Sequence, residues 1–405
     1  MFGFKSTSAG KCRAEAHTSQ HSGRRKTVYR VMCLLFSSLI SLVLAETALR
    51  MLDRPHAPAV GWKWEGDPGE ANEFGFRGHR RTAQADTTVL LLGDSQVQGL
   101  PSLPFHAMPE VFLAEALKQL TKREFHIVSV GSSGWGQDQQ ILALEKYLRE
   151  IKPRDVALWF QPVNDFWNNT FPTHFPKDGL PKPTFWLEGD ALRGPNTPWM
   201  ATSGRHAWYL LRLWDRARGF PQFITDEEWE ARLPPPYQAD PCDGQCEGSL
   251  RDFVAQQRGI SPQDVPYFSG EDFSNEKTHY SISLYPGSPR LAYSVKLTRA
   301  LLLEISKVCQ ENGARLTVFY IDDRRLIPDE PTNFEVGGKK ITLSGASARA
   351  LINEVLTGIP TLRIQGLPAN STTSNTDSHL NEAGNKYVMS ELAHWLVNTP
   401  SLPRS

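Results

Sequence analysis

The stretch VLLLGDSQVQGL, residues 89–100, joins an apolar run to Gly93, Asp94 and Ser95 and then continues as a polar segment. An uninterrupted apolar run of this length, ended by small residues, is typical of a strand buried on both faces. A serine that follows such a strand usually caps the next helix. Ser95 is therefore either an ordinary strand-to-helix residue or a residue placed to react.

Similar apolar runs elsewhere in the chain indicate the fold. They occur at 87–93, 125–131, 155–161 and 314–322, and segments with apolar residues at helical spacing lie between them. This alternation predicts an α/β fold with a mainly parallel sheet covered on both faces. The stretch from about 170 to 290 breaks the rhythm and is rich in Pro, Gly, Trp and acidic residues, which predicts a large loop-rich insertion over the carboxyl edge of the sheet.

The overall composition excludes several classes of function. The 405 residues include 44 Lys and Arg and 44 Asp and Glu, so the net charge of zero gives no pull towards nucleic acid. The histidines show no metal-ligand spacing, and there is no phosphate-binding glycine loop. We therefore expect no metal, no cofactor and no nucleic-acid partner, whereas the oligomeric state is left open.

The N-terminus predicts export of the rest of the chain. Residues 1–30 form a basic tail, and 31–45 contain no charged residue. Counted from Val28 to Leu49, the apolar segment is long enough to span a bilayer. Because the basic residues precede it, the positive-inside rule predicts a cytoplasmic tail at 1–30 and a transmembrane signal anchor at 31–49. A linker and domain entry at 50–86 would then lead to a periplasmic or extracellular domain at 87–397.

Two alternatives to the anchor stay open. The letters VLA before Glu46 also resemble a small-residue cleavage site, so the segment is alternatively a signal peptide whose removal secretes the protein. A buried helix of a soluble protein is the remaining reading.

The five cysteines are too few for a disulfide scaffold. Cys242 and Cys246 lie close together in a loop-like stretch, where a disulfide, two unlinked thiols and a metal site with partners elsewhere are the alternatives.

The groups of a serine hydrolase follow the predicted strands. Distinctive loops occur at Gly93–Ser95, 131–140 and 162–169, and Asp377 and His379 precede the closing helix. In open α/β sheets such loops meet beyond the carboxyl ends of the strands. Together they supply a nucleophile, a base, an orienting carboxylate and oxyanion donors. The Gly-x-Ser-x-Gly elbow is absent, which excludes the common α/β-hydrolase signature.

These four blocks, in this order, resemble the SGNH (GDSL-type) hydrolase superfamily over residues 70–165 and 290–397. NEFGFRG at 72–78 and KPTFWLEGDAL at 182–192 are similar to stretches of its membrane-anchored bacterial members. The resemblance implies a flavodoxin-like three-layer α/β/α fold.

The resemblance also implies a role for each residue that matches the four blocks. Ser95 corresponds to the nucleophile, His379 to its base and Asp377 to the carboxylate that orients the histidine. The Ser95 amide, the Gly134 amide and the Asn164 side chain correspond to the oxyanion hole.

The sequence departs from the family pattern in two places. Pro162 stands where a glycine is usual, and the last block is Asp-x-His rather than Asp-x-x-His. Trp135 and Trp167 directly follow or flank the oxyanion residues, so they are expected either to bind substrate or to pack in the core.

The sequence thus predicts an extracytoplasmic serine esterase that hydrolyses O-acyl esters, O-acetyl esters above all, of a small molecule or glycan. An O-acetyltransferase acting on cell-surface glycan would need the same residues. A catalytically inactive glycan-binding or scaffold domain is the alternative from another class.

Overall fold

The computed structural model describes residues 11–52, 64, 66–81, 87–170, 182–195, 255, 261, 280–287, 289–323, 327, 329–336, 339–374 and 377–399. Cys242 and Cys246, and most of the predicted insertion, lie outside the described residues. The N-terminal helix and the α/β domain belong to separate units of the chain.

The domain is organised around a five-stranded parallel sheet with the order β10-β7-β3-β1-β2. Its strands are β1 (Thr87–Gly93), β2 (Phe125–Gly131), β3 (Asp155–Trp159), β7 (Arg315–Ile321) and β10 (Thr361–Ile364). Along the chain this order is 2-1-3-4-5, which is the flavodoxin-like arrangement. The predicted parallel α/β sheet is confirmed.

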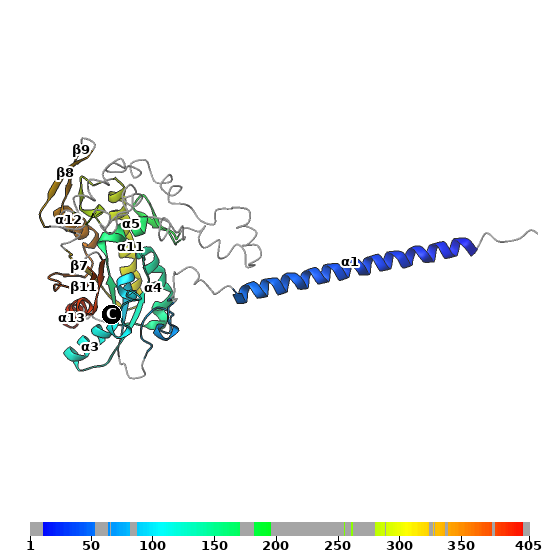
Figure 1. The fold of residues 1–405 in the computed structure, drawn as a ribbon, viewed down its shortest axis with the longest axis horizontal. Helices are drawn as coiled ribbons and strands as arrows, with labels where there is room; N and C mark the ends of the chain where they lie inside the picture. Colours follow the sequence, from blue (N-terminus) through cyan, green and yellow to red (C-terminus); the bar gives the residue numbers. More distant parts are fainter. Residues whose placement is uncertain are drawn as a thin grey trace, which may run out of the picture. The chain divides into compact units, whose positions relative to one another are not determined.

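Helices cover both faces of the sheet, as labelled in Figure 1. They are α3 (Pro109–Thr121), α4 (Gln137–Ile151), α11 (Pro289–Glu311), α12 (Gly345–Leu356) and α13 (Glu382–Asn398). Because strand side chains alternate, Val89 and Leu91 pack in a core with α3 and α13. Leu90 and Leu92 pack in the other core, with α4, α11 and α12. The continuous apolar run of β1 exists because both of its faces are buried.

The segment before β1 is part of the domain. Phe74 and Phe76 are buried in the core on the α4 side of the sheet. The buried Arg77 ion-pairs with Glu70 at 2.8 Å and donates to the carbonyl oxygens of Leu100 and Leu103, each at 2.7 Å. Residues 66–81 therefore pack on the domain and hold the loop that contains Leu100 and Leu103. They belong to the region that was predicted to be the linker and domain entry.

Small sheets accompany the central sheet in the described part of the domain. They are the hairpin of β4 (Trp186–Glu188) with β5 (Ala191–Arg193), the three-stranded sheet of β6 (Leu284–Tyr285), β9 (Lys339–Leu343) and β8 (Thr332–Val336), and the hairpin of β11 (Thr372–Ser374) with β12 (Asp377–Leu380). Single turns of 3-10 helix occur at Pro68–Glu70, Phe105–Ala107 and Ser281–Ser283.

Helix α1, Lys11–Leu52, contains one segment that is long and apolar enough to cross a membrane, Val28–Ala48 with a mean hydropathy of 2.0. Its large apolar side chains from Val28 to Leu44 are exposed. By length and composition it could be a membrane anchor or a signal sequence.

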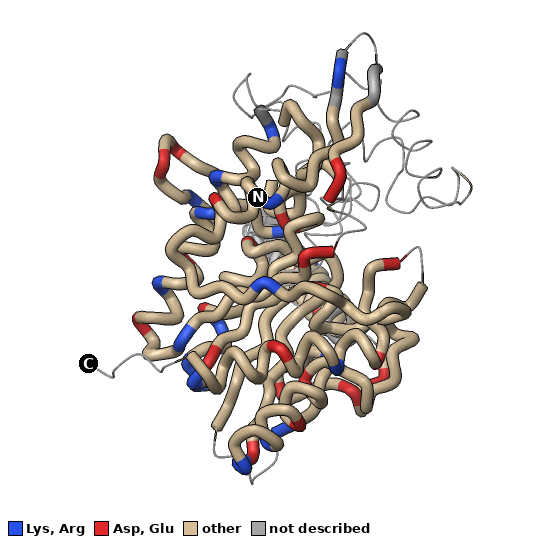
Figure 2. Tube along the Cα trace, turned by 90° about the vertical axis from the view of Figure 1, so that its left-hand side faces the viewer, with Lys and Arg blue, Asp and Glu red and all other residues tan. Residues whose placement is uncertain are grey.

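Charged residues of both signs are interspersed along the described trace (Figure 2). This distribution agrees with the net charge of zero and forms no single-sign field over the described part of the domain.

Candidate active site

The central strands bring the predicted loops to one edge of the sheet. β1 pairs with both β2 and β3, and the register sets Gly93 opposite Gly131 and Leu92 opposite Leu158. Along the chain, β2 is added on one side of β1, and β3 is then added on the other side. Open α/β sheets form their binding crevice at such a reversal, which here lies between β1 and β3. Ser95 follows β1 directly, and Asn164 lies just beyond β3.

Ser95 is the first residue of a short helix, α2 (Ser95–Gln98). The Asp94 side chain caps this helix by accepting a hydrogen bond of 2.9 Å from the Gln96 amide. Gly93 permits the sharp turn, because a Cβ atom there would lie 2.6 Å from Cγ2 of Val97. As the first helical residue, Ser95 has an amide without an intrahelical acceptor.

The structure brings Ser95, His379 and Asp377 together. His379 Nε2 lies 2.8 Å from Ser95 Oγ, and His379 Nδ1 lies 2.6 Å from Oδ1 of Asp377. An ionised carboxylate only accepts hydrogen bonds, so Nδ1 carries the proton and Nε2 is left to accept the serine hydroxyl. This is the hydrogen-bonding order of a nucleophile, its base and an orienting carboxylate.

The Asp-x-His spacing is accommodated by an extended strand. Asp377 and His379 both lie on β12, where side chains two residues apart point to the same face. The Asp377 carboxylate also accepts the His379 amide at 2.9 Å, so it holds both the backbone and the ring. One residue fewer than the usual spacing therefore still lets the carboxylate reach the imidazole.

Gln96 docks β12 onto α2, the short helix that begins at Ser95. Its side-chain amide donates to the carbonyl oxygen of Ser378 at 3.2 Å and accepts from the Leu380 amide at 3.3 Å. Sequence reasoning missed Gln96, because nothing in its local pattern indicates a partner almost three hundred residues away.

The charges around His379 favour its protonated form. Burial lowers the pKa of His379, but the hydrogen bond and charge of Asp377 and the charge of Asp94 outweigh it and raise the pKa above the usual 6.5. Burial raises the pKa of Asp377, but the hydrogen bonds from His379 dominate and lower it to about 2. Asp377 is therefore ionised throughout the range in which His379 titrates.

The predicted oxyanion residues lie at the same edge of the sheet. Asn164 donates to Oδ2 of the buried Asp94 at 3.3 Å. Gly134 lies in the turn after β2 with a φ of +70°, which favours glycine, and its amide has no acceptor among the described residues. The Ser95, Gly134 and Asn164 donors thus follow three adjacent strands.

The predicted loop at 162–169 is instead a helix, α5 (Pro162–Thr170). Proline suits the first helical turn, where its missing amide proton costs nothing. The buried Asp165 accepts from the Gln137 side chain at 2.7 Å and from the Gln161 amide at 2.8 Å, which ties α5 to α4. Burial, followed by the charge of Asp94, raises the pKa of Asp165 well above its usual value.

Trp135 does not take the predicted substrate-binding role. Its side chain is 0% exposed and contacts Phe76 edge-on at 5.6 Å between ring centroids, so it is part of the core. Trp167 is half-buried, and its indole donates to the Val163 carbonyl at 3.3 Å within α5, so its substrate-binding role stays a prediction. No group of three or more His, Cys, Asp or Glu in the described ranges is arranged to hold a metal ion.

The raised pKa of His379 predicts a pH dependence. Only the neutral imidazole accepts a proton, so kcat/KM for a neutral acetyl ester should fall as the pH decreases through a midpoint above 6.5. Asp94→Asn removes one charge that raises this pKa, and the acid limb should move to lower pH. The matched control is Asp190→Asn in the exposed turn between β4 and β5. An acid limb that stays in place in Asp94→Asn contradicts the electrostatic effect of Asp94 on His379.

Comparison with known proteins gives only remote similarities. No protein-family model matches the chain, and no curated protein matches it. Among solved structures, LAE5, an alpha/beta hydrolase enzyme from the metagenome of Lake Arreo, is 16% identical, with 78% of this chain and 98% of that chain covered and a TM-score of 0.25. A catalytic mutant of Axe2, an acetylxylan esterase from Geobacillus stearothermophilus, is 11% identical, with 80% and 100% covered and a TM-score of 0.23. At these TM-scores the similarities carry no argument about the activity of this chain.

Proposed function

We propose that this protein is an SGNH-type serine esterase that hydrolyses O-acyl esters through an acyl-serine intermediate. The observation that carries the proposal is the continuous hydrogen-bonded series from Asp377 through His379 to Ser95, with 2.6 and 2.8 Å between the paired atoms. A serine hydroxyl is a weak nucleophile until a base within hydrogen-bond reach accepts its proton.

The proposed reaction has two acyl-transfer steps. Ser95 Oγ attacks the ester carbonyl carbon while His379 Nε2 takes the hydroxyl proton, and collapse of the tetrahedral intermediate breaks the bond to the alcohol, which leaves with that proton. Water then attacks the acyl-serine, gives a proton to His379 and releases the acid, and the proton returns to Ser95. Asp377 keeps the ring in the required tautomer and stabilises the imidazolium.

The oxyanion of each tetrahedral intermediate would be met by the Ser95 amide, the Gly134 amide and the Asn164 side chain. Support comes from their positions beyond three neighbouring strands and from the contact that orients the Asn164 amide against Asp94. A donor of this kind is typically worth about 2.7–4 kcal/mol of transition-state stabilisation.

We place the catalytic domain outside the cytoplasm, anchored by α1. The apolar segment Val28–Ala48 and the basic residues that precede it support this orientation. Secretion after cleavage near Ala45 is the alternative. Mass-spectrometric determination of the N-terminus of the mature chain distinguishes the two, because cleavage removes the chain up to about Ala45.

A fluorophosphonate probe tests the activated serine directly. We expect the full chain in detergent to be labelled, Ser95→Ala to be unlabelled, and Ser102→Ala, which alters an exposed serine in the loop after α2, to be labelled like wild type. Folded wild type that resists labelling would favour the inactive binding domain, and labelled Ser95→Ala would exclude Ser95 as the nucleophile.

An acetate-release assay of the full chain distinguishes ester hydrolysis from acyl transfer. Acetate release from an acetyl ester is measured with and without an acceptor glycan. We expect release in both cases, whereas transfer to the glycan without appreciable release contradicts the esterase.

A further inference from the structure

A cavity of about 830 Å³ lies at the carboxyl ends of β7 and β10. Asp322 and Asp323, directly after β7, form one side of it, and residues 366–374, which follow β10 and include β11, form the other. Its volume is within the range of small-molecule sites, roughly 300–1,000 Å³. Ser95 and His379 are not among the described residues that line it, so the cavity is separate from the Ser95–His379 pair.

One wall of the cavity belongs to the hairpin that carries the catalytic base. β11 pairs with β12 in antiparallel register, with Thr372 opposite Leu380 and Ser374 opposite Asp377. The Thr373 hydroxyl, which lines the cavity, also hydrogen-bonds the Asp377 carboxylate and helps to lower its pKa. A molecule in the cavity therefore lies against the strand that supports Asp377 and His379.

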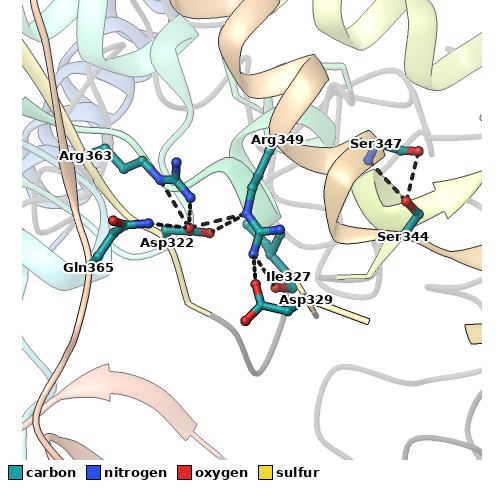
Figure 3. Close-up of polar contacts among 8 residues, drawn as sticks. All are labelled: Asp322, Ile327, Asp329, Ser344, Ser347, Arg349, Arg363 and Gln365. Carbon is teal, nitrogen blue, oxygen red and sulfur yellow. Dashed lines mark hydrogen bonds and ion pairs between the residues drawn. The ribbon is translucent and has the colours of Figure 1, made fainter. Parts of the chain in front are cut away.

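The negative charge of the lining residue Asp322 is compensated by its neighbours (Figure 3). The Asp322 side chain is only 2% exposed and is ion-paired with Arg363 of β10 and with Arg349 of α12. The Gln365 amide donates to the same carboxylate at 3.3 Å. Burial raises the pKa of Asp322, but the hydrogen bonds from Arg363 and Gln365 outweigh it and lower the pKa, so the group stays ionised and paired. Arg349 is fixed in turn by Asp329 at 2.7 Å.

The rest of the lining favours a neutral ligand rich in hydroxyl groups. Between 370 and 374 the chain presents an asparagine, two serines and two threonines, which both donate and accept hydrogen bonds. Leu367 and Pro368 add apolar surface, as a sugar ring needs for its C–H face. No Lys or Arg is in the described lining, and Asp323 supplies a further carboxylate, so an anionic ligand is disfavoured.

We propose that this cavity binds the alcohol portion of the ester as a neutral sugar residue and excludes anionic sugars. The proposal rests on the proposed esterase, because it assigns the acyl group to Ser95 and the alcohol portion to the cavity. It also predicts a preference for neutral over anionic sugars, which the Ser95–His379–Asp377 arrangement does not determine.

Filling the cavity tests the proposal. Ala369 is an exposed lining residue, and Ala369→Trp adds bulk without removing a hydrogen bond. We expect this variant to raise KM for an O-acetylated methyl glucoside about tenfold, with kcat/KM for methyl acetate, whose methanol portion does not need the cavity, within twofold of wild type. The matched control, Ala350→Trp on the exposed face of α12, should leave both esters unaffected. Equal KM values in the Ala369→Trp and Ala350→Trp variants, or equal losses on both esters, would overturn the proposal.

A second variant tests hydrogen bonding to the sugar rather than the volume of the cavity. Asn370 has a φ of +61°, so Asn370→Gly removes the amide without backbone strain. We expect a several-fold higher KM for the glucoside ester only. Wild type should also use the O-acetylated methyl glucuronoside less well than the glucoside, whereas equal use of the two would overturn the charge argument.

Direct binding separates this inference from the proposed function. Titration calorimetry of an unacylated neutral gluco-oligosaccharide with the full chain in detergent needs no catalysis. Binding that Ala369→Trp weakens and Ala350→Trp preserves supports the sugar site even if no ester is hydrolysed. Absence of binding at millimolar oligosaccharide, or binding that Ala369→Trp leaves unchanged, overturns it even if Ser95 proves to be the nucleophile.

Discussion

Alanine at Ser95 or at His379 is expected to reduce kcat for an acetyl ester by about 10⁵–10⁶-fold, and the double variant should lose little more. The reason is that the two side chains act as one unit: Ser95 reacts only when His379, 2.8 Å away, accepts its proton. With either group missing, the other has no role in the attack. Steady-state kinetics of wild type, both single variants and the double variant give this comparison.

The controls for this cycle are Ser102→Ala and His394→Ala, which alter an exposed serine and an exposed histidine of the same domain. Both should retain the wild-type kcat. Additive losses from Ser95→Ala and His379→Ala would show that the two residues act independently, and the proposed proton transfer between them would then be wrong.

Breaking the buried ion pair between Lys182 and Asp138 should cause the largest loss of stability. Both side chains are 0% exposed, and Lys182 also donates to the carbonyl oxygen of Asn168. Removing one partner leaves a buried charge without compensation, so Asp138→Asn or Lys182→Met should each lower the free energy of unfolding by about 3–5 kcal/mol. The double variant should be more stable than either single variant, because it leaves no unpaired charge. Urea unfolding of the full chain in detergent measures these differences.

The stability defect of Lys182→Met should depend on pH. Burial raises the pKa of Asp138, and this effect outweighs the charge of Lys182, which lowers it. Lys182→Met removes that charge, so the pKa of Asp138 should rise further. A carboxyl group with a folded pKa above its unfolded value destabilises the fold as the pH rises, so this defect should shrink towards acid pH. Asp138→Asn lacks this carboxyl group, so the recovery towards acid pH should be absent from that variant. The control is Lys307→Ala, which removes an exposed ion pair with Glu304 and should not change stability measurably. An equal recovery of both single variants towards acid pH would contradict the effect of burial on Asp138.

The strands of the sheet were predictable, because burial on both faces leaves a mark in the local sequence. The runs at 87–93 and 125–131 coincide with β1 and β2, and the runs at 155–161 and 314–322 contain β3 and β7. The helix α5 was missed, since Asn164 and Asp165 are residues typical of turns. Their helical placement depends on Gln137 of α4, which holds the Asp165 carboxylate.

The chemical groups of the candidate site were also predictable, whereas their environment was not. Ser95, Asp377 and His379 stand out by residue type and order, and their catalytic roles stay predictions for the kinetics above. The burial of Trp135 was not predictable, because its partner Phe76 belongs to a segment more than fifty residues earlier. The contribution of Thr373 to the pKa of Asp377 likewise depends on the pairing of β11 with β12.

The sequence by itself determined the parallel α/β class, the order of the loops at the sheet edge and the identities of the candidate nucleophile, base and carboxylate. The fold class follows from local patterns, which repeat along the chain with the period of the element that they form. The three candidate roles follow from residue type and from the resemblance to the SGNH blocks. Only the tertiary structure decided that Gln96 docks β12 onto the helix of Ser95, that Asp94 acts on both Asn164 and His379, and that a cavity adjoins the hairpin. Distances, burial and pKa shifts arise between residues that are remote in sequence, so no local pattern contains them.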